Sequence, residues 1–481
     1  MDRLHRLHGM PDTDEDSLAA LRRLQDRFRE FLSAHGYALL ETPILEPTEL
    51  FLRKSGGELA ARMYTFTDPG GNQVSLRPEY TSSVVRHHLE GDSPSLPIRV
   101  QYSGPVFRYG DRSELPRQFT QVGAELLGSV DVRADAEILS ISHGALTHLG
   151  IAGHRMVMTD QGVLYRLLEA LELSDRAVGF ILASIPDLKD GTAGMTRVQQ
   201  RAEALHILRA PMRDGRSPDG LPAEGARDLL ESLMRREELG SPAQRDPAEI
   251  VDRLLRRFTG ADDPARLHRG LELASRLGPI RGEPASSIAR AEAVIRDAGL
   301  DTSALDGIKQ VIPIAEARGL PADAVNLDFG LTRGLAYYTG TVFEITLDGQ
   351  DGSLGGGGRY DGLARALGGG SQLPALGFAY TAERLLEVTG SDEVDVARSA
   401  ADVLVLAETV QGYRHAAHLA DELRRKGKRV ELDVRGMDLN QGLDYARGRG
   451  IVEVVEVDAS GDPTSHRVAE AYARHRAEGV A

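Results

Sequence analysis

Residues 327–347 read LDFGLTRGLAYYTGTVFEITL, and the organisation of the chain can be worked outward from them. Residues 341–347 form a β-branched and aromatic run typical of a strand, so we expect a β-hairpin over the whole stretch. Successive side chains on a strand point to opposite faces, so Tyr337 and Tyr338 would lie on opposite sides, one of them beside Arg333. An arginine and a phenol can hold a small anion, although a buried hairpin with an exposed arginine would give the same pattern.

The composition narrows the class of protein. A length of 481 residues suggests roughly three domains. The formal net charge of -15 argues against a nucleic-acid binder, because such proteins neutralise phosphates with basic residues, although a local basic patch remains compatible with it. The chain has no cysteine, which excludes disulfides and cysteine metal sites. With neither a membrane-length apolar run nor a secretory signal, we expect a cytoplasmic protein without membrane contact.

The hydrophobic patterns predict an α+β fold. A helix is expected over 17–35 and a strand–turn–strand unit over 63–77. Two further strands, 98–103 and 106–109, are expected to be separated by Gly104 and Pro105, and alternating strands and helices after residue 400 indicate a small α/β domain. The expected segments are a core over 1–190, a helical insert over 191–300, the second part of the core over 301–390, and the α/β domain over 400–481.

Polar residues at two places suggest a ligand site. In the expected strand 118–127, Gln121 and Glu125 share one face, which suits the floor of a polar pocket. An exposed edge strand would explain these two residues as well. Glu79 and Thr81 flank the start of a helix, where they could hold an ammonium group or simply lie beside a helix cap.

Glycines and arginines add to this picture. The run LGGGGRYDGL at 354–363 lacks the ending of a phosphate-binding loop, so its glycines are expected to let a strand pass close beneath a ligand. Three arginines that are far apart in sequence, Arg108, Arg333 and Arg384, suit an anionic ligand. A basic cluster at 424–429 could contact RNA or only solubilise a helix end.

Four motifs carry a resemblance to a known family. RGLAYY at 333–338 resembles the histidine-binding signature of the class II histidyl-tRNA synthetases, and it is the most specific match. Residues 41–46, 104–128 and 375–384 resemble the class II motifs 1, 2 and 3. The resemblance extends to a non-catalytic relative, the regulatory subunit of ATP phosphoribosyltransferase. It implies an antiparallel class II synthetase-like core and a C-terminal domain that resembles an anticodon-binding domain.

The resemblance also implies roles for single residues. Arg333 would contact the carboxylate of histidine and, in a ligase, act as the catalytic arginine; Arg108 and Arg384 would bind ATP phosphates. The residues expected to hold histidine are Glu79, Thr81, Gln121, Glu125, Arg333, Tyr337 and Tyr338. No residue is assigned to a metal.

Departures from the synthetase pattern favour the regulatory subunit as the predicted function. Gly110 stands where a synthetase carries a glutamate that holds adenine, Tyr80 stands where synthetases have glycine, and the loop at 111–116 is short. The alternative is a histidine–tRNA ligase. A regulatory subunit would need no cofactor and would bind free histidine and a short catalytic ATP phosphoribosyltransferase subunit. A ligase would need ATP, Mg and tRNA, and either protein would form a homodimer through the motif 1 region.

Overall fold

The computed structural model describes residues 4–53, 57–91, 95–110, 116–205, 207, 263–331, 338–350, 352–369, 373–389, 401–407 and 409–471. The chain divides into two compact units, one formed by 1–11 and 23–391 and the other by 12–22 and 392–481. Most of the middle of the expected insert, 208–262, lies outside the described residues, as do Arg333 and Tyr337.

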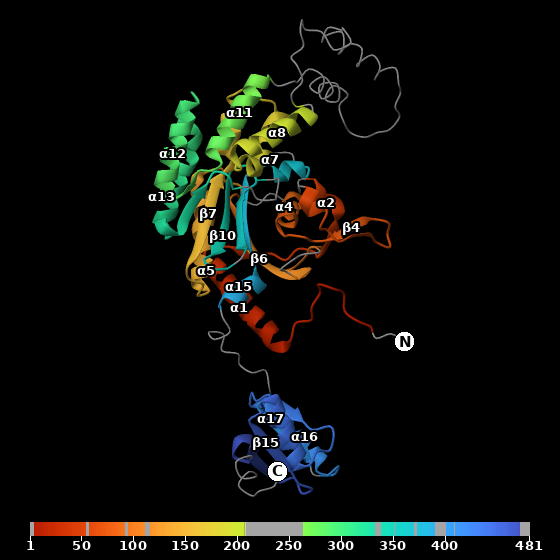
Figure 1. The fold of residues 1–481 in the computed structure, drawn as a ribbon. Coiled ribbons are helices and arrows are strands. Elements are labelled where there is room, and N and C mark those ends of the chain that lie inside the picture. The colour runs from red at the N-terminus through yellow and green to blue at the C-terminus, as the bar shows by residue number, and fades with distance from the viewer. Residues whose placement is uncertain are drawn as a thin grey trace. The chain divides into compact units, whose positions relative to one another are not determined.

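A nine-stranded sheet forms the centre of the first unit (Figure 1). Its neighbouring strands run antiparallel except for the pairs β1–β5 and β7–β9. The predicted antiparallel, strand-rich core is therefore confirmed. In sheet order the strands are β1 Ala38–Leu39, β5 Ile98–Phe107, β6 Gln118–Leu127, β12 Ala375–Thr381, β11 Ser353–Arg359, β10 Thr341–Leu347, β7 His154–Asp160, β9 Val325–Asp328 and β8 Arg281–Gly282.

The predicted hairpin over 327–347 is wrong. Its two ends do form strands, β9 and β10, but β7 lies between them and pairs with both. β10 instead forms its hairpin with β11, the glycine-rich strand that follows it in the chain. Local sequence could not show this, because the strand that separates the two ends comes from about 170 residues earlier in the chain.

Two expectations about β5 and β6 are also corrected. Gly104 and Pro105 do not end a strand, since β5 continues from Ile98 to Phe107 and pairs with β6 throughout. β6 is not an edge strand, because β5 and β12 flank it. The polar side chains of β6 therefore lie in the interior of the sheet, where they need partners.

Helices cover the sheet on the face opposite to Glu125. Phe28 packs edge-on against Phe378 and Tyr380 of β12, and the Tyr380 hydroxyl donates to the carbonyl of Ser142 at 2.8 Å. The first helix of the chain, α1 Glu15–Ala34, confirms the prediction at 17–35, and its residues from 23 onward belong to this unit. The other helices of this unit are α2 Thr48–Leu52, α3 Gly57–Ala60, α4 Thr81–Glu90, α5 Val132–His148, α6 Gln161–Glu169, α7 Asp175–Leu188, α8 Gly191–Ala204, α11 Pro264–Leu277, α12 Pro284–Asp297, α13 Asp306–Ala317, α14 Leu363–Ala366 and α15 Ala382–Thr389.

A small second sheet, in the order β2–β4–β3, precedes α4 in the chain and contains the predicted strand–turn–strand unit. Its strands are β2 Leu45–Pro47, β3 Thr65–Thr67 and β4 Gln73–Leu76. Arg77, which follows β4, is fully buried and donates to the carbonyl oxygens of Pro105 and Thr42. These hydrogen bonds connect the segment before α4 to β5 and to the motif 1 region.

The second unit is a small α/β domain, as the sequence predicts. Three of its strands are parallel, and the last one runs antiparallel at the edge, in the order β14–β13–β15–β16. Its elements are β13 Val403–Ala407, α16 Tyr413–Arg425, β14 Val430–Leu432, α17 Leu439–Arg449, β15 Glu453–Val457 and β16 Pro463–Arg467. None of the helices in the described part of the chain is long and apolar enough to cross a membrane.

Candidate functional site

A cavity of about 300 Å³ opens over the strands β6, β12 and β11 of the large sheet. Strand register explains the floor of this cavity. Glu125 of β6 lies opposite Gly377 of β12, which lies opposite Gly358 of β11, so all three residues share one face. Six of the predicted site residues line the cavity: Glu79, Thr81, Arg108, Gln121, Glu125 and Tyr338.

Glycines make room for the side chains of this site. A Cβ atom on Gly377 would lie 1.6 Å from Oε2 of Glu125. A Cβ atom on Gly358 would lie 2.8 Å from Cδ1 of Tyr338, so the tyrosine ring rests on this glycine. The glycine-rich β11 therefore brings its backbone close to the cavity.

Glu125 is the centre of the polar network in the cavity. Its Oε1 accepts hydrogen bonds from Thr81 Oγ1 at 2.7 Å and from the Tyr102 hydroxyl at 3.0 Å, and its Oε2 accepts one from the Tyr360 hydroxyl. Burial raises the pKa of Glu125 to about 7, although the three hydroxyl donors act in the opposite direction. A carboxylate has about four acceptor positions, so one remains for a ligand.

Glu79 is the second buried acid. Both of its oxygens accept from the backbone nitrogen of Ser82, at 3.1 and 3.2 Å, so Glu79 satisfies a free N–H at the start of α4. Burial raises the pKa of Glu79, and the nearby charge of Arg108 acts in the opposite direction. Two buried carboxyl groups in one cavity favour a ligand that carries N–H donors or positive charge.

Aromatic rings form the wall behind Glu125. The ring of Tyr80 is stacked on that of Tyr102, with centroids 4.4 Å and planes 5° apart, and the guanidinium of Arg77 lies 3.9 Å from the Tyr80 centroid. The backbone nitrogen of Tyr80 donates to Oε1 of Gln121 at 3.2 Å. Tyr80 therefore orients Gln121 as well as supporting the ring whose hydroxyl contacts Glu125.

The remaining predicted residues are placed differently. Arg108 lies at the cavity and donates from Nε to the carbonyl of Pro78 at 2.8 Å. Arg384 of α15 does not line the cavity. Its guanidinium lies beside Gly352, the residue before β11, where an added Cβ atom would be 2.9 Å from Nη1. Arg333 and Tyr337 lie outside the described residues.

Sequence reasoning missed Tyr102 and Tyr360, whose hydroxyl groups both contact Glu125. Tyr102 lies opposite Gly123 on the paired strand, so its place on the cavity face follows from the register of β5 against β6. Tyr360 directly follows β11, and the alternation of side chains places it on the cavity face once Arg359 is known to point the other way. The tyrosine after the glycine run was a visible signal, but the sequence did not show which acid it meets.

Similarity to solved structures identifies the fold. The structure titled as an ATP phosphoribosyltransferase regulatory subunit/histidyl-tRNA synthetase from Bacillus halodurans is 20% identical, covers 95% of this chain and 99% of its own, and gives a TM-score of 0.64. The histidyl-tRNA synthetase from Nostoc is 18% identical, gives a TM-score of 0.60, and covers 99% of this chain and 100% of its own. That from S. aureus is 22% identical, gives a TM-score of 0.54, and covers 98% of this chain and 99% of its own. The fold is that of the class II synthetase-like proteins.

Sequence relatives narrow this class to a family. The sequence model of histidyl-tRNA synthetase matches residues 9–218 and 255–385, so the chain belongs to the histidyl-tRNA synthetase family. The histidine–tRNA ligase of Methanocaldococcus jannaschii is 28% identical over 463 residues, which are 93% of this chain and 90% of the ligase. That of Thermococcus kodakarensis is 29% identical over 464 residues, which are 95% of this chain and 91% of the ligase.

Proposed function

We propose that this chain is a histidine–tRNA ligase, which activates histidine with ATP and transfers it to tRNA. The proteins that support this function match the chain over nearly its whole length and are named histidine–tRNA ligases. The observation that carries the proposal is Glu125, a buried acid with three hydroxyl donors and one acceptor position left for an N–H group of the ligand. This proposal replaces the regulatory subunit as the preferred function.

The proposed binding mode follows from the charges around the cavity. Glu125 and Glu79 would accept from the imidazole and ammonium groups of histidine, with Thr81, Gln121, Tyr337 and Tyr338 as neighbours. Arg333 would contact the carboxylate and stabilise the charge that develops on it during activation. Arg108 and Arg384 would bind the phosphates of ATP, because a guanidinium donates two parallel hydrogen bonds to such groups.

A ligase of this kind would use Mg²⁺ with its ATP. Among the described residues there is no group of three or more histidine, aspartate or glutamate side chains that could hold a metal ion. No step is assigned to a protein-bound ion. A magnesium ion at this site would be held mainly by the phosphates of the nucleotide.

Exchange of pyrophosphate into ATP tests the activation step. We expect exchange that depends on histidine and is not supported by other amino acids, and aminoacylation of histidine tRNA by the same preparation. Glu125→Gln should lose this exchange. Glu137→Gln, on α5, is its control for the general effect of losing a buried acid, because Glu137 contacts Arg99 and Tyr37 rather than the cavity. Histidine binding without any exchange would contradict the ligase.

The second candidate is the regulatory subunit of an ATP phosphoribosyltransferase, and one observation favours it. Gly110 occupies the position at which the synthetase pattern has the glutamate that holds adenine. Histidine would then act as an allosteric ligand that binds one arrangement of the assembly better than the other. Histidine binding without exchange, together with histidine-dependent inhibition of a short catalytic subunit, would support this function.

We further infer a homodimer through the motif 1 region. Three large apolar residues lie close together in this part of the sequence and are exposed: Leu39 by 56%, Ile44 by 43% and Leu45 by 43%. Apolar residues gathered on a surface are typical of an interface.

The domain division is proposed on the resemblance to the synthetases: an insert at 191–300 and an anticodon-binding-like domain at 400–481. The basic residues at 424–429 of that domain would then face tRNA.

A further inference from the structure

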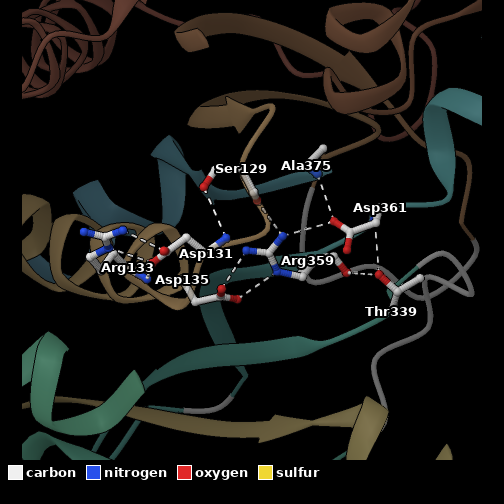
Figure 2. A network of polar contacts seen from close by, with 8 residues as sticks. All are labelled: Ser129, Asp131, Arg133, Asp135, Thr339, Arg359, Asp361 and Ala375. Atoms are coloured by element: carbon white, nitrogen blue, oxygen red, sulfur yellow. Dashed lines mark hydrogen bonds and ion pairs between the residues drawn. The ribbon is translucent and has the colours of Figure 1, made fainter. Parts of the chain in front are cut away.

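Arg359, the last residue of β11, lies in a network of buried polar contacts on the helix-covered face of the sheet (Figure 2). Its Nε and Nη2 donate to the two carboxylate oxygens of Asp135 in α5, at 3.1 and 2.6 Å. Its Nη1 donates to the carbonyl of Ser129 at 2.9 Å and to Asp361 at 3.2 Å. Only 9% of the Arg359 side chain and 8% of the Asp135 side chain are exposed.

The next residue in the chain points into the candidate site. Tyr360 donates its hydroxyl hydrogen to Glu125, and its backbone nitrogen donates to the carbonyl of Ala375 at 2.7 Å. Neighbouring residues of an extended chain project to opposite faces, so the guanidinium below the sheet and the phenol above it belong to one rigid piece of backbone. Any rotation of that backbone would move both groups together.

The same network holds the segment that carries Tyr338. The backbone nitrogen of Thr339 donates to the carbonyl of Arg359 at 2.8 Å, and the Thr339 hydroxyl accepts from the backbone nitrogen of Asp361 at 3.1 Å (Figure 2). A Cβ atom on Gly340 would lie 3.0 Å from Cδ of Arg359, so the segment lies directly on this side chain. Arg359 therefore adjoins Tyr360 in its own segment and, through Thr339 and Gly340, the segment that carries Tyr338.

A purely structural role is the simplest alternative, and the molecule contains a matched example of it. Arg99 of β5 donates to both oxygens of Glu137, two residues along α5 from Asp135, at 2.6 and 2.9 Å. This pair also joins the sheet to α5, and like Arg359 and Asp135 its two residues do not line the cavity. The difference is that the chain neighbours of Arg99, Ile98 and Val100, do not line it either, whereas Tyr360 does. Buried ion pairs add little net stability in general, so stability alone gives little reason for the Arg359–Asp135 pair.

We propose that Arg359 is a positioning residue of the histidine site, and that its ion pair with Asp135 sets the Tyr360 hydroxyl against Glu125 and holds Tyr338 at the cavity. The proposal rests on the proposed binding of histidine. Arg359 itself contacts no ligand; it acts through the two tyrosines. Lysine at this position would keep the charge but could not donate two parallel hydrogen bonds to Asp135.

A double-mutant cycle with histidine calorimetry tests the proposal. We expect Arg359→Lys and Tyr360→Phe each to weaken histidine binding about tenfold or more, the loss that follows from one hydrogen bond to a charged group. The loss in the double variant should be smaller than the sum of the two single losses, because Arg359→Lys acts in part through the Tyr360 contact that Tyr360→Phe has already removed; the remainder acts through Tyr338. Arg99→Lys should bind like the wild type. Independent, additive losses, or an Arg359→Lys variant that matches Arg99→Lys, would overturn the proposal.

A second measurement needs no histidine and so separates this proposal from the proposed function. The Tyr360 hydroxyl lowers the pKa of Glu125, so both Arg359→Lys and Tyr360→Phe should move the pH dependence of thermal stability to higher pH by the same amount. Arg99→Lys should not move it. If the wild type fails to bind histidine, the proposed function fails, while this shift still supports or contradicts the positioning role. Asp135→Glu serves as a second variant should Arg359→Lys not fold.

Discussion

The hydroxyl of Thr81 lies 2.7 Å from Oε1 of Glu125, which joins the first residue of α4 to the interior strand β6. These two residues are 44 positions apart in the chain. Glu125 is therefore fixed by donors from three segments, and the position of its carboxylate depends on the tertiary structure rather than on β6 alone.

Replacing Glu125 should abolish most of the affinity for histidine. We expect Glu125→Ala to weaken binding by about 1.5–3 kcal/mol, the range for a hydrogen bond to a charged group, as measured by calorimetry. Glu137→Ala, which removes a buried acid from the other face of the sheet, is expected to lower stability and to leave histidine affinity unchanged. Equal affinities in the Glu125 variant and the wild type would rule out the site.

The stability of the ligand-free protein should depend on pH through Glu125. Burial raises the pKa of Glu125 to about 7 from its ordinary 4.5, so between these values the folded protein holds a proton that the unfolded chain has released. The proton held by the folded protein stabilises it, and this contribution of Glu125 to the free energy of unfolding is present at low pH and is lost as pH rises through about 7. Glu125→Gln cannot titrate, so its melting temperature relative to the wild type should rise from pH 5 to pH 8 in calorimetric scans. Parallel curves for the two proteins would contradict the raised pKa.

A single methyl group at Gly377 should damage the site. The new Cβ atom would lie 1.6 Å from Oε2 of Glu125 and 2.6 Å from the carbonyl oxygen of Ala124, so the acid or the strand must move. We expect Gly377→Ala to lose about 1–3 kcal/mol of stability, measured by denaturant unfolding, and to lose histidine binding. Gly179→Ala is the matched control, because a Cβ atom there meets nothing within 4 Å and a helical alanine is favoured over glycine. A Gly377→Ala protein with normal affinity would show that Glu125 is not held as described.

A charge in the motif 1 region should dissociate the proposed dimer. Leu45 is 43% exposed, so Leu45→Glu costs the single chain little, but in an interface it would bury an unpaired charge. We expect the mass measured by sedimentation to fall to that of one chain. Val130→Glu, at a position that is 77% exposed outside this region, should keep the mass of the wild type. If both variants sediment like the wild type, the interface lies elsewhere.

Local sequence patterns were enough for elements whose signals lie within one segment. The spacing of apolar residues predicted α1, the turn residues predicted the β3–β4 unit, and alternation after residue 400 predicted the small α/β domain. The alternation in β6 placed Gln121 and Glu125 on one face correctly, since strand periodicity does not depend on the neighbouring strands. These predictions needed no knowledge of which segments meet.

Predictions that required knowing a neighbour were less successful. The 327–347 stretch contains two strands, but a hairpin was inferred because the intervening β7 is far away in sequence. β5 runs through Gly104 and Pro105, where a Cβ atom on the glycine would lie 2.2 Å from the Tyr80 hydroxyl; that glycine makes room for a ring rather than ending a strand. Turn-forming residues can therefore have a packing role that local propensity does not show.

The sequence by itself determined the chemical inventory of the site: two acids, a glutamine, a threonine and arginines in recognisable surroundings, with strand alternation to set their faces. Only the tertiary structure decided that Tyr102 and Tyr360 donate to Glu125, and that Arg359 is fixed to Asp135 behind the sheet. The physical reason is that periodicity acts between residues a few positions apart. Hydrogen-bond partners, burial and the resulting pKa of Glu125 depend on strands brought together from more than 200 residues away.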